Sequence, residues 1–134
     1  MLGAWGEPII KQFVQEAINE AMKLESALAR LRMEPRIAVL HYAPIRQTVE
    51  GEPLEIFPFL GCSRLGDPLN RYPVTAVVHG HAHNGTLEGQ TDSGMPVYNV
   101  SAPLLRKKNA DKPPFRLLEI EVNPVAVEPA HHPT

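Results

Sequence analysis

The chain has 134 residues, of which 43% are hydrophobic, and a formal net charge of −2. This size suits one domain or part of one, with enough apolar residues for a packed core. The composition excludes three classes of protein. There is no basic stripe for nucleic acid, no apolar stretch near the roughly 20 residues that span a bilayer, and only one cysteine, so no internal disulfide framework. A cytoplasmic location without membrane contact is expected, since no secretory signal opens the chain.

The first predicted element is a long amphipathic helix that starts at Glu7-Pro8 and ends before Pro35. Proline suits the first helical turn, and Pro35 disfavours helix at the residue before it. Apolar residues recur at spacings of three and four, as expected for one buried helical face. They are Ile10, Phe13, Val14, Ala17, Ile18, Ala21, Leu24, Leu28 and Leu31. We expect this helix to lie on a sheet as a layer.

Two short apolar segments predict buried strands. Residues 36–41 lie between Pro35 and Pro44, and residues 74–78 run directly into His79. Both are short, apolar and rich in β-branched residues, as expected for strands covered on both faces. Residues 42–73 between them show no sustained period and predict a long loop with one short helix near residues 68–72.

The rest of the chain predicts further strands and a tail. Residues 86–91 and 96–100, separated by Ser93-Gly94, are typical of a hairpin or of two sheet strands. Residues 106–108 are basic and predict a solvated turn. Residues 115–122 alternate and predict a strand with one face to solvent. We therefore expect an α/β domain over residues 1–122 and a proline-rich tail over 123–134.

Three histidines follow the two predicted buried strands. His41 closes the first strand, and His81 and His83 come just after the second. Because ligands of α/β sheets bind beyond the carboxyl ends of strands, these imidazoles are candidate metal ligands. The pattern favours a metal role for the His81/His83 pair, whereas His41 taken alone is more typical of a polar surface residue.

Neighbouring residues are assigned supporting roles. Gly80 is expected to let the backbone turn tightly before the ligands. His79 belongs to the apolar strand, so we interpret it as structural or as support for the ligands. His131 and His132 in the tail are interpreted as incidental.

The histidine segments resemble one known family. Leu40-His-Tyr-Ala-Pro44 is similar to the strand–histidine–proline segment of calcineurin-like metallophosphoesterases, and Val77-Val-His-Gly-His-Ala-His83 to their Gly-His-X-His motif. Tyr98-Asn99-Val100-Ser101 is similar to the strand and turn that follow, which gives Asn99 a structural role.

The resemblance implies a fold, an activity and a set of ligands. The fold would be the C-terminal half of a four-layer αββα sandwich. The activity would be hydrolysis of phosphomonoesters or phosphodiesters at two divalent ions, Mn, Fe or Zn. His41 and His81 would bind one ion and His83 the other.

The chain departs from the family in a way that affects the expected activity. The family's Asp-X-His, Gly-Asp-X-X-Asp and Gly-Asn-His segments are absent, and they would supply the carboxylates of a two-ion site. We therefore expect a C-terminal fragment, completed by the missing N-terminal half or by a homo-oligomer. Nearby acids are interpreted as solvated turn residues: Asp67, Glu88 and Asp92. Arg46 and Arg71 are weak candidates for binding a phosphate-ester substrate, with surface ion pairing as the commoner role.

Two alternatives remain open. The chain can be a non-catalytic remnant or interaction module with a weak three-histidine metal site. It can also be a cupin-like protein with one metal, since Glu88 and Gly94 follow His81-Ala-His83 at nearly the expected distances. In the cupin pattern, however, Thr75 stands where a glycine is expected.

Overall fold

The structure is a computed structural model that describes residues 7–122. Its α-helices are α1 (Glu7–Arg30), α2 (Phe57–Leu60), α3 (Gly66–Arg71) and α4 (Ala102–Lys108). Its strands are β1 (Ile37–Leu40), β2 (Ala76–His79), β3 (Glu88–Gln90) and β4 (Pro96–Asn99). Two 3-10 helices, η1 (Leu54–Ile56) and η2 (Ser63–Leu65), precede α2 and α3.

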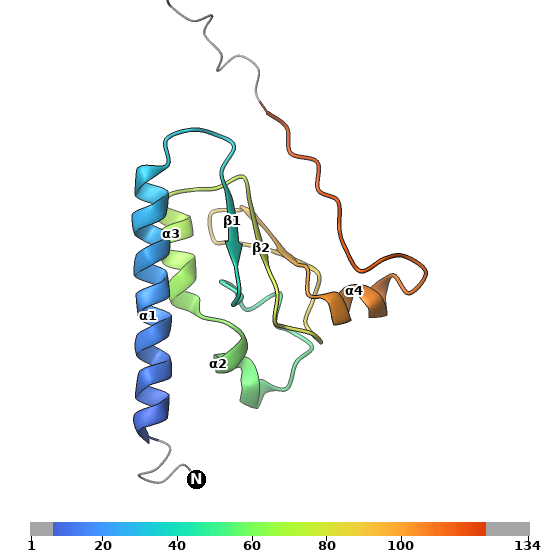
Figure 1. Cartoon of the computed structure of the whole chain (residues 1–134), viewed down its shortest axis with the longest axis horizontal. Helices are drawn as coiled ribbons and strands as arrows, with labels where there is room; N and C mark the ends of the chain where they lie inside the picture. The colour runs from blue at the N-terminus through green and yellow to red at the C-terminus, as the bar shows by residue number, and fades with distance from the viewer. Residues whose placement is uncertain (1–6, 123–134) are drawn as a thin grey trace, which may run out of the picture.

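The four strands form one mixed sheet in the order β1-β2-β4-β3. β1, β2 and β4 run parallel, and β3 pairs antiparallel with β4 (Figure 1). Parallel neighbours need a crossover connection, and the segment that links β1 to β2 provides one with its short helices. The predicted α/β class is therefore confirmed, as are the two strands predicted on either side of Ser93-Gly94.

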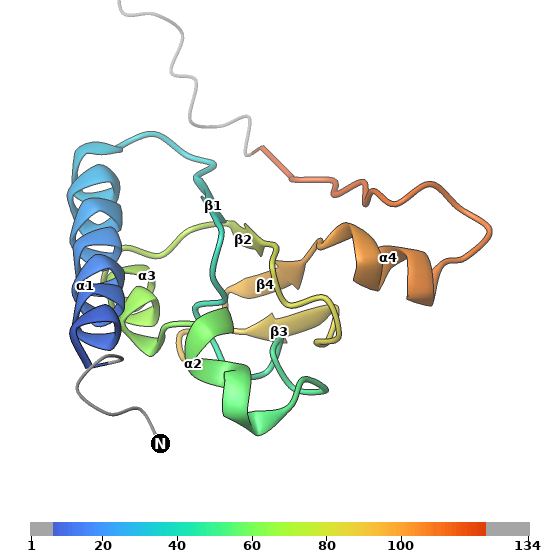
Figure 2. The ribbon, with the colours of Figure 1, turned by 60° about the horizontal axis from the view of Figure 1, so that its bottom comes forward.

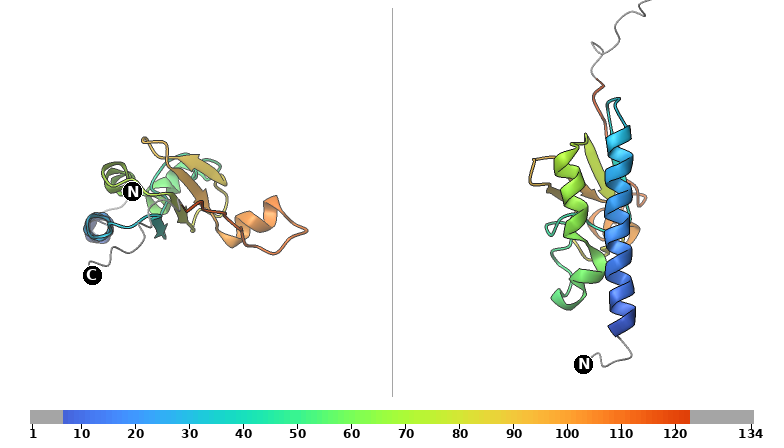
Figure 3. Two further views of the ribbon diagram at one scale, coloured as in Figure 1. Left: turned by 90° about the horizontal axis from the view of Figure 1, so that it is seen from above. Right: turned by 90° about the vertical axis from the view of Figure 1, so that its left-hand side faces the viewer.

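One face of the sheet packs against α1 and α3, which stand side by side (Figure 3). Ala38, Val77 and Val97 are neighbours across β1, β2 and β4 and are all buried. Leu28 of α1 and Leu69 of α3 pack with these three residues in one buried hydrophobic cluster. Burying each leucine or valine contributes about 1.5–3 kcal/mol, so this seam between helices and sheet is the main core.

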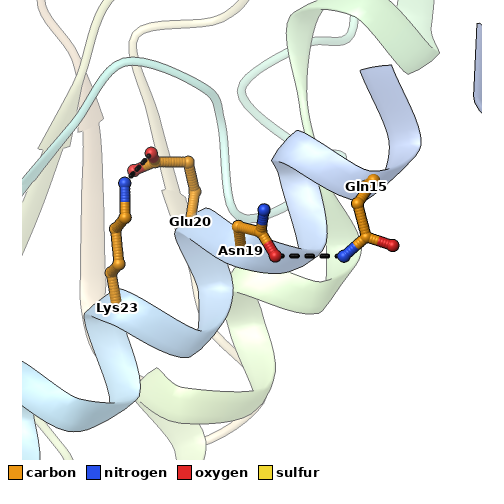
Figure 4. A network of polar contacts seen from close by, with 4 residues as sticks. All are labelled: Gln15, Asn19, Glu20 and Lys23. Atoms are coloured by element: carbon orange, nitrogen blue, oxygen red, sulfur yellow. Dashed lines mark hydrogen bonds and ion pairs between the residues drawn. The ribbon is translucent and has the colours of Figure 1, made fainter. Parts of the chain in front are cut away.

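The predicted long helix is confirmed as α1, but only part of its apolar stripe is buried. Ala21 and Leu28 are buried, whereas Ile10 and Val14, nearer the amino end, are exposed. The polar side of the helix carries local pairs in which Gln15 donates to Asn19 at 3.0 Å and Lys23 pairs with Glu20 at 3.2 Å (Figure 4). These exposed contacts between neighbouring turns support the helix by a few tenths of a kcal/mol each.

The prediction that β1 is buried on both faces is wrong, because β1 is an edge strand. Only Ala38 is buried, while Ile37 is 46% and Val39 76% exposed. Side chains alternate between the faces of a strand, so these two lie on the face away from α1. In contrast, β2 lies between β1 and β4 and is buried, as predicted.

The segment between β1 and β2 is more ordered than the predicted loop. The short helix expected near residues 68–72 is α3, and α2 with the two 3-10 turns was not anticipated. The Ala43 backbone N–H donates to Leu60 at 3.0 Å, and the Cys62 N–H donates to Ala43 at 2.9 Å. These bonds hold α2 beside the carboxyl end of β1 (Figure 2).

The predicted strand at residues 115–122 does not form. A strand needs a hydrogen-bonded neighbour, and this segment joins neither edge of the sheet. Its apolar residues Phe115 and Leu117 remain exposed. Arg116 engages the sheet: its guanidinium pairs with Glu88 and lies 4.6 Å from the ring centre of Tyr98.

The basic residues 106–108 are exposed, as predicted, but they form the last turn of helix α4 rather than a separate turn. Positive charge at a helix carboxyl end is favourable because it offsets the helix dipole. The tail predicted for residues 123–134 lies outside the described residues. Among residues 7–122, no helix has the length and apolar character to cross a membrane.

Candidate metal centre

Two of the three candidate histidines meet at the carboxyl edge of the sheet. His41 directly follows β1, and His81 lies two residues beyond the end of β2. β1 and β2 are parallel, so both side chains emerge at the same edge, as the sequence predicts. The ring centres of His41 and His81 lie 4.6 Å apart with an interplanar angle of 29°.

His83 lies next to this pair but is not in the same stack. Its ring centre is 6.4 Å from that of His81, at an interplanar angle of 82°. Over residues 7–122, no three His, Cys, Asp or Glu side chains are arranged so that they could hold one ion. A two-ion centre also needs carboxylates, and the described residues bring none into such a group with these histidines.

The backbone around His81 adopts an uncommon conformation. His81 has a φ of 71°, and it is the one non-glycine residue with positive φ in the described part of the chain. The Ala82 N–H donates to the Gly80 carbonyl at 2.9 Å, which closes a γ-turn centred on His81. A γ-turn with positive φ is rare and strained. Strain of this kind is found mostly at functional sites.

The role expected for Gly80 is not what the structure shows. Gly80 has no positive φ, and a side chain at its position would meet no atom within 4 Å. The residue that requires glycine is Gly85, where an added Cβ would lie 2.1 Å from the Thr48 carbonyl oxygen. The tight turn is thus made at His81, and the close approach of two backbones is made at Gly85.

A carbonyl group selects the tautomer of His81. The Nε2 atom lies 3.0 Å from the Phe59 carbonyl oxygen. A carbonyl only accepts, so in the neutral ring Nε2 carries the proton and Nδ1 keeps its lone pair. Histidines that bind metals usually donate their second N–H to a carbonyl or carboxylate in this way. The His81 side chain therefore has an unprotonated Nδ1 that can accept a hydrogen bond or a ligand.

His79 is a buried residue beside the site and does not face it. Its Nδ1 donates to the Gly80 carbonyl at 2.8 Å, and its Nε2 accepts from the Thr48 hydroxyl at 2.7 Å. Burial in the interior lowers the pKa of His79 below its ordinary value, with the Gly80 bond opposing this. A neutral, hydrogen-bonded imidazole agrees with the structural role predicted for it.

Asn99, at the end of β4, is fully buried behind the histidine turn. Its side-chain amide donates to the carbonyl oxygens of Ala82 at 2.8 Å and Thr48 at 3.3 Å. Its own carbonyl accepts from the Ser101 backbone N–H at 3.2 Å. Asn99 thus supports the residue between His81 and His83, in agreement with the supporting role that the resemblance implies.

His41 borders a hollow of about 470 Å³ between α1 and β1. Its apolar lining includes Phe13, Leu24 and Leu40, while Glu16, Glu20 and Lys23 line the side of α1. Aromatic rings connect this hollow to the histidines: Tyr42 makes edge contacts with His41 at 4.9 Å and with His81 at 5.6 Å.

The structure does not bring both candidate arginines to the histidines. Arg71 ends α3 and pairs with Glu25 of α1. It precedes β2 and therefore lies toward the amino end of that strand, whereas His81 follows the carboxyl end. Arg46 lies on the segment after β1, with its guanidinium 5.5 Å from the centre of the Phe57 ring. Its role in binding substrate stays a prediction.

The acids considered from the sequence do not complete the site. Glu88 is on β3 and pairs with Arg116, and Asp67 and Asp92 are exposed beside a separate cleft. A mixed sheet with two packed helices is also unlike the all-β barrel that a cupin requires. His131 and His132 lie outside the described residues.

Sequence reasoning missed several residues that hold the site together. Thr48 is fully buried and contacts His79, while the buried Glu52 accepts from the Asn84 backbone N–H at 2.6 Å. The Ser101 hydroxyl donates to the Ala82 carbonyl at 3.3 Å. Thr48 and Glu52 are single polar residues in a loop without period, so no pattern distinguishes them from solvated residues. Ser101 lies within the 98–101 segment that resembles the family, but a single serine there does not indicate a functional role.

The site is thus a stacked histidine pair at a sheet edge, with a third histidine beside it and a buried polar network behind it. Its strained turn and selected tautomer are properties of this chain's own backbone and side chains. Comparison with protein-family models, curated proteins and solved structures found no match.

Proposed function

We propose that this chain carries the histidine part of a metal-dependent phosphoesterase, which hydrolyses phosphomonoesters or phosphodiesters once carboxylate ligands are supplied. The observation that carries the proposal is His81: it stacks on His41, occupies a strained γ-turn, and keeps Nδ1 free by donating from Nε2. Strain and a selected tautomer at one exposed edge are difficult to explain as packing alone.

The residues have separate tasks in this proposal. His41 and His81 hold one divalent ion, Mn, Fe or Zn, and His83 reaches toward a second. Divalent ions in such centres polarise the phosphoryl oxygen and acidify water. Asn99 and His79 keep the histidine turn in place, and Arg46, on the segment that follows β1, is available to a substrate oxygen.

The sheet has two surfaces on which a completing segment can dock. β1 is an edge strand with Val39 exposed, and its neighbours on the same face, Val78 and Tyr98, are only half-buried. An apolar face and an open edge beside His41 suit a second sheet, as in the four-layer sandwich that the resemblance implies. We propose that this segment comes from an N-terminal half or from a second copy.

Metal titration tests the proposal. We expect one zinc or manganese ion per chain by isothermal titration calorimetry, with binding lost in His41→Ala and in His81→Ala. The matched control is His131→Ala combined with His132→Ala, which removes two histidines from the proline-rich tail and is expected to leave binding unchanged. Hydrolysis of a chromogenic phosphodiester with manganese is expected only when a carboxylate-bearing partner is added.

A second candidate is a non-catalytic interaction module. It is favoured by one observation, the absence of any three converging metal-binding side chains among residues 7–122. If the chain binds no ion at micromolar concentrations, and His81→Ala gives the same titration as wild type, the interaction module is the better account. The phosphoesterase proposal is then abandoned.

A further inference from the structure

The turn that carries His81 and His83 is tied to the segment after β1 by one buried residue, Thr48. Its side chain is fully buried, and its hydroxyl lies 2.7 Å from Nε2 of His79. Its carbonyl oxygen accepts from the Thr86 backbone N–H at 2.9 Å and from the Asn99 amide at 3.3 Å. Thr48 therefore bonds to three segments that are distant in sequence.

The direction of the hydroxyl bond follows from its neighbours. Nδ1 of His79 faces the Gly80 carbonyl, which only accepts, so Nδ1 carries the proton. Nε2 is then the acceptor, and the Thr48 hydroxyl must donate. Serine can replace this donor, but valine, which has nearly the same shape, cannot. Removing the hydroxyl leaves the buried Nε2 without a partner.

The same residues determine where the histidine turn lies. The Ala82 carbonyl, between His81 and His83, accepts from Asn99 at 2.8 Å and from the Ser101 hydroxyl at 3.3 Å. Gly85 passes so close to Thr48 that no side chain fits between them. The strained backbone of His81 persists only if the surrounding structure holds it, and these contacts do so.

We propose that Thr48 is a positioning residue for the histidine turn, holding residues 80–85 so that the His81 ring stacks on His41. It acts through His79, Asn99 and the backbone, and it has no part in binding an ion. The expected change in zinc affinity rests on the proposed function, whereas the expected loss of contact between the His41 and His81 rings does not.

The test compares Thr48→Val with Thr48→Ser in the full chain, using two readouts. In metal-free protein, proton NMR measures the cross-relaxation between the His41 and His81 rings. Zinc titration then measures affinity. We expect Thr48→Val to lose the ring contact and to weaken zinc binding about tenfold, the lower end of the range for residues that support metal ligands. Thr48→Ser should retain both.

The matched control is Thr91→Val, which also removes a buried threonine hydroxyl. Thr91 bonds to the Ser93 hydroxyl at 3.1 Å and to the Met95 N–H at 3.0 Å, at the β3–β4 connection. This variant should leave the ring contact and zinc affinity unchanged. If Thr48→Val does not fold, Thr48→Cys, with its weaker donor, replaces it and should give a graded loss.

The outcomes separate the two proposals. If Thr48→Val keeps the ring contact, or if Thr91→Val loses it equally, Thr48 has no positioning role. If wild-type protein binds no zinc, the metal proposal fails, and the ring contact alone still decides the role of Thr48.

Discussion

At the scale of single residues, His81 combines an unfavourable backbone conformation with an imidazole that the proposed metal centre needs. Its φ of 71° lies in the left-handed region, which glycine enters freely and other L residues enter at a cost of about 1–2 kcal/mol. Backbone stability alone would favour glycine at this position, so the proposed function accounts for the imidazole there.

The strain at His81 predicts how two substitutions at this position affect the free energy of unfolding. His81→Gly should unfold at higher urea concentration than His81→Ala, by about 1 kcal/mol in free energy of unfolding, because both lose the ring but only glycine relieves the backbone. The same pair at His83, which has no positive φ, serves as the control and should rank in the opposite order. Equal stability of the two His81 variants would show that the turn is not strained.

The burial of His79 predicts how the stability of the fold depends on pH. Its folded-state pKa is lowered by desolvation, so the unfolded chain binds the extra proton more readily. The stabilisation is complete above the ordinary histidine pKa of about 6.5 and is lost as pH falls below it. Urea unfolding should show a loss of up to about 1.4 kcal/mol between pH 7.5 and pH 5.5. His79→Gln should flatten this difference; an unchanged slope would assign it to other groups.

At the scale of elements, α1 contributes to the core through its carboxyl half. Leu28 is 4% exposed within the main cluster, whereas Leu31, just past the helix end, is 52% exposed. Leu28→Ala should therefore cost about 3 kcal/mol, and Leu31→Ala less than about 1 kcal/mol, in free energy of unfolding measured with urea. Similar losses at the two positions would mean that the helix packs differently from this description.

The segment at residues 115–122 shows how an element depends on its neighbours. Its alternating sequence is typical of a strand, yet it has no partner strand in this structure, although Arg116 contacts the sheet. The short helix α4 shows the opposite case. It forms where the sequence indicated a turn, because Leu104 and Leu105 are buried by surrounding structure that no local pattern reveals.

At the scale of the whole molecule, the open edge of the sheet is the main feature to be explained. An edge strand with exposed apolar side chains is a template for pairing with another chain. Val39 of this edge strand is 76% exposed and lies on the face away from α1.

Val39→Lys is therefore expected to reduce association, because a charge on the edge opposes pairing with another strand. Sedimentation velocity should show less self-association than wild type, and thermal unfolding should change little because Val39 is 76% exposed. Val122→Lys places the same charge on an exposed residue outside the sheet and should have no effect. Equal behaviour of both variants and wild type would indicate that this edge is not an interface.

The sequence by itself determined the elements that depend on local periodicity. The 3.6-residue repeat of α1, the apolar run of β2 and the strands around Ser93-Gly94 were all predictable, because spacing along the chain decides them. It also indicated that His41 and His81 meet, because two parallel strands deliver them to one edge.

Only the tertiary structure decided what depends on contacts between distant segments. These are the exposure of β1, the strained turn at His81, the position of Arg71 away from the site, and the bonds that Thr48 makes to His79 and Asn99. Burial and hydrogen bonding depend on which residues are neighbours in space, and a loop without period does not indicate its neighbours.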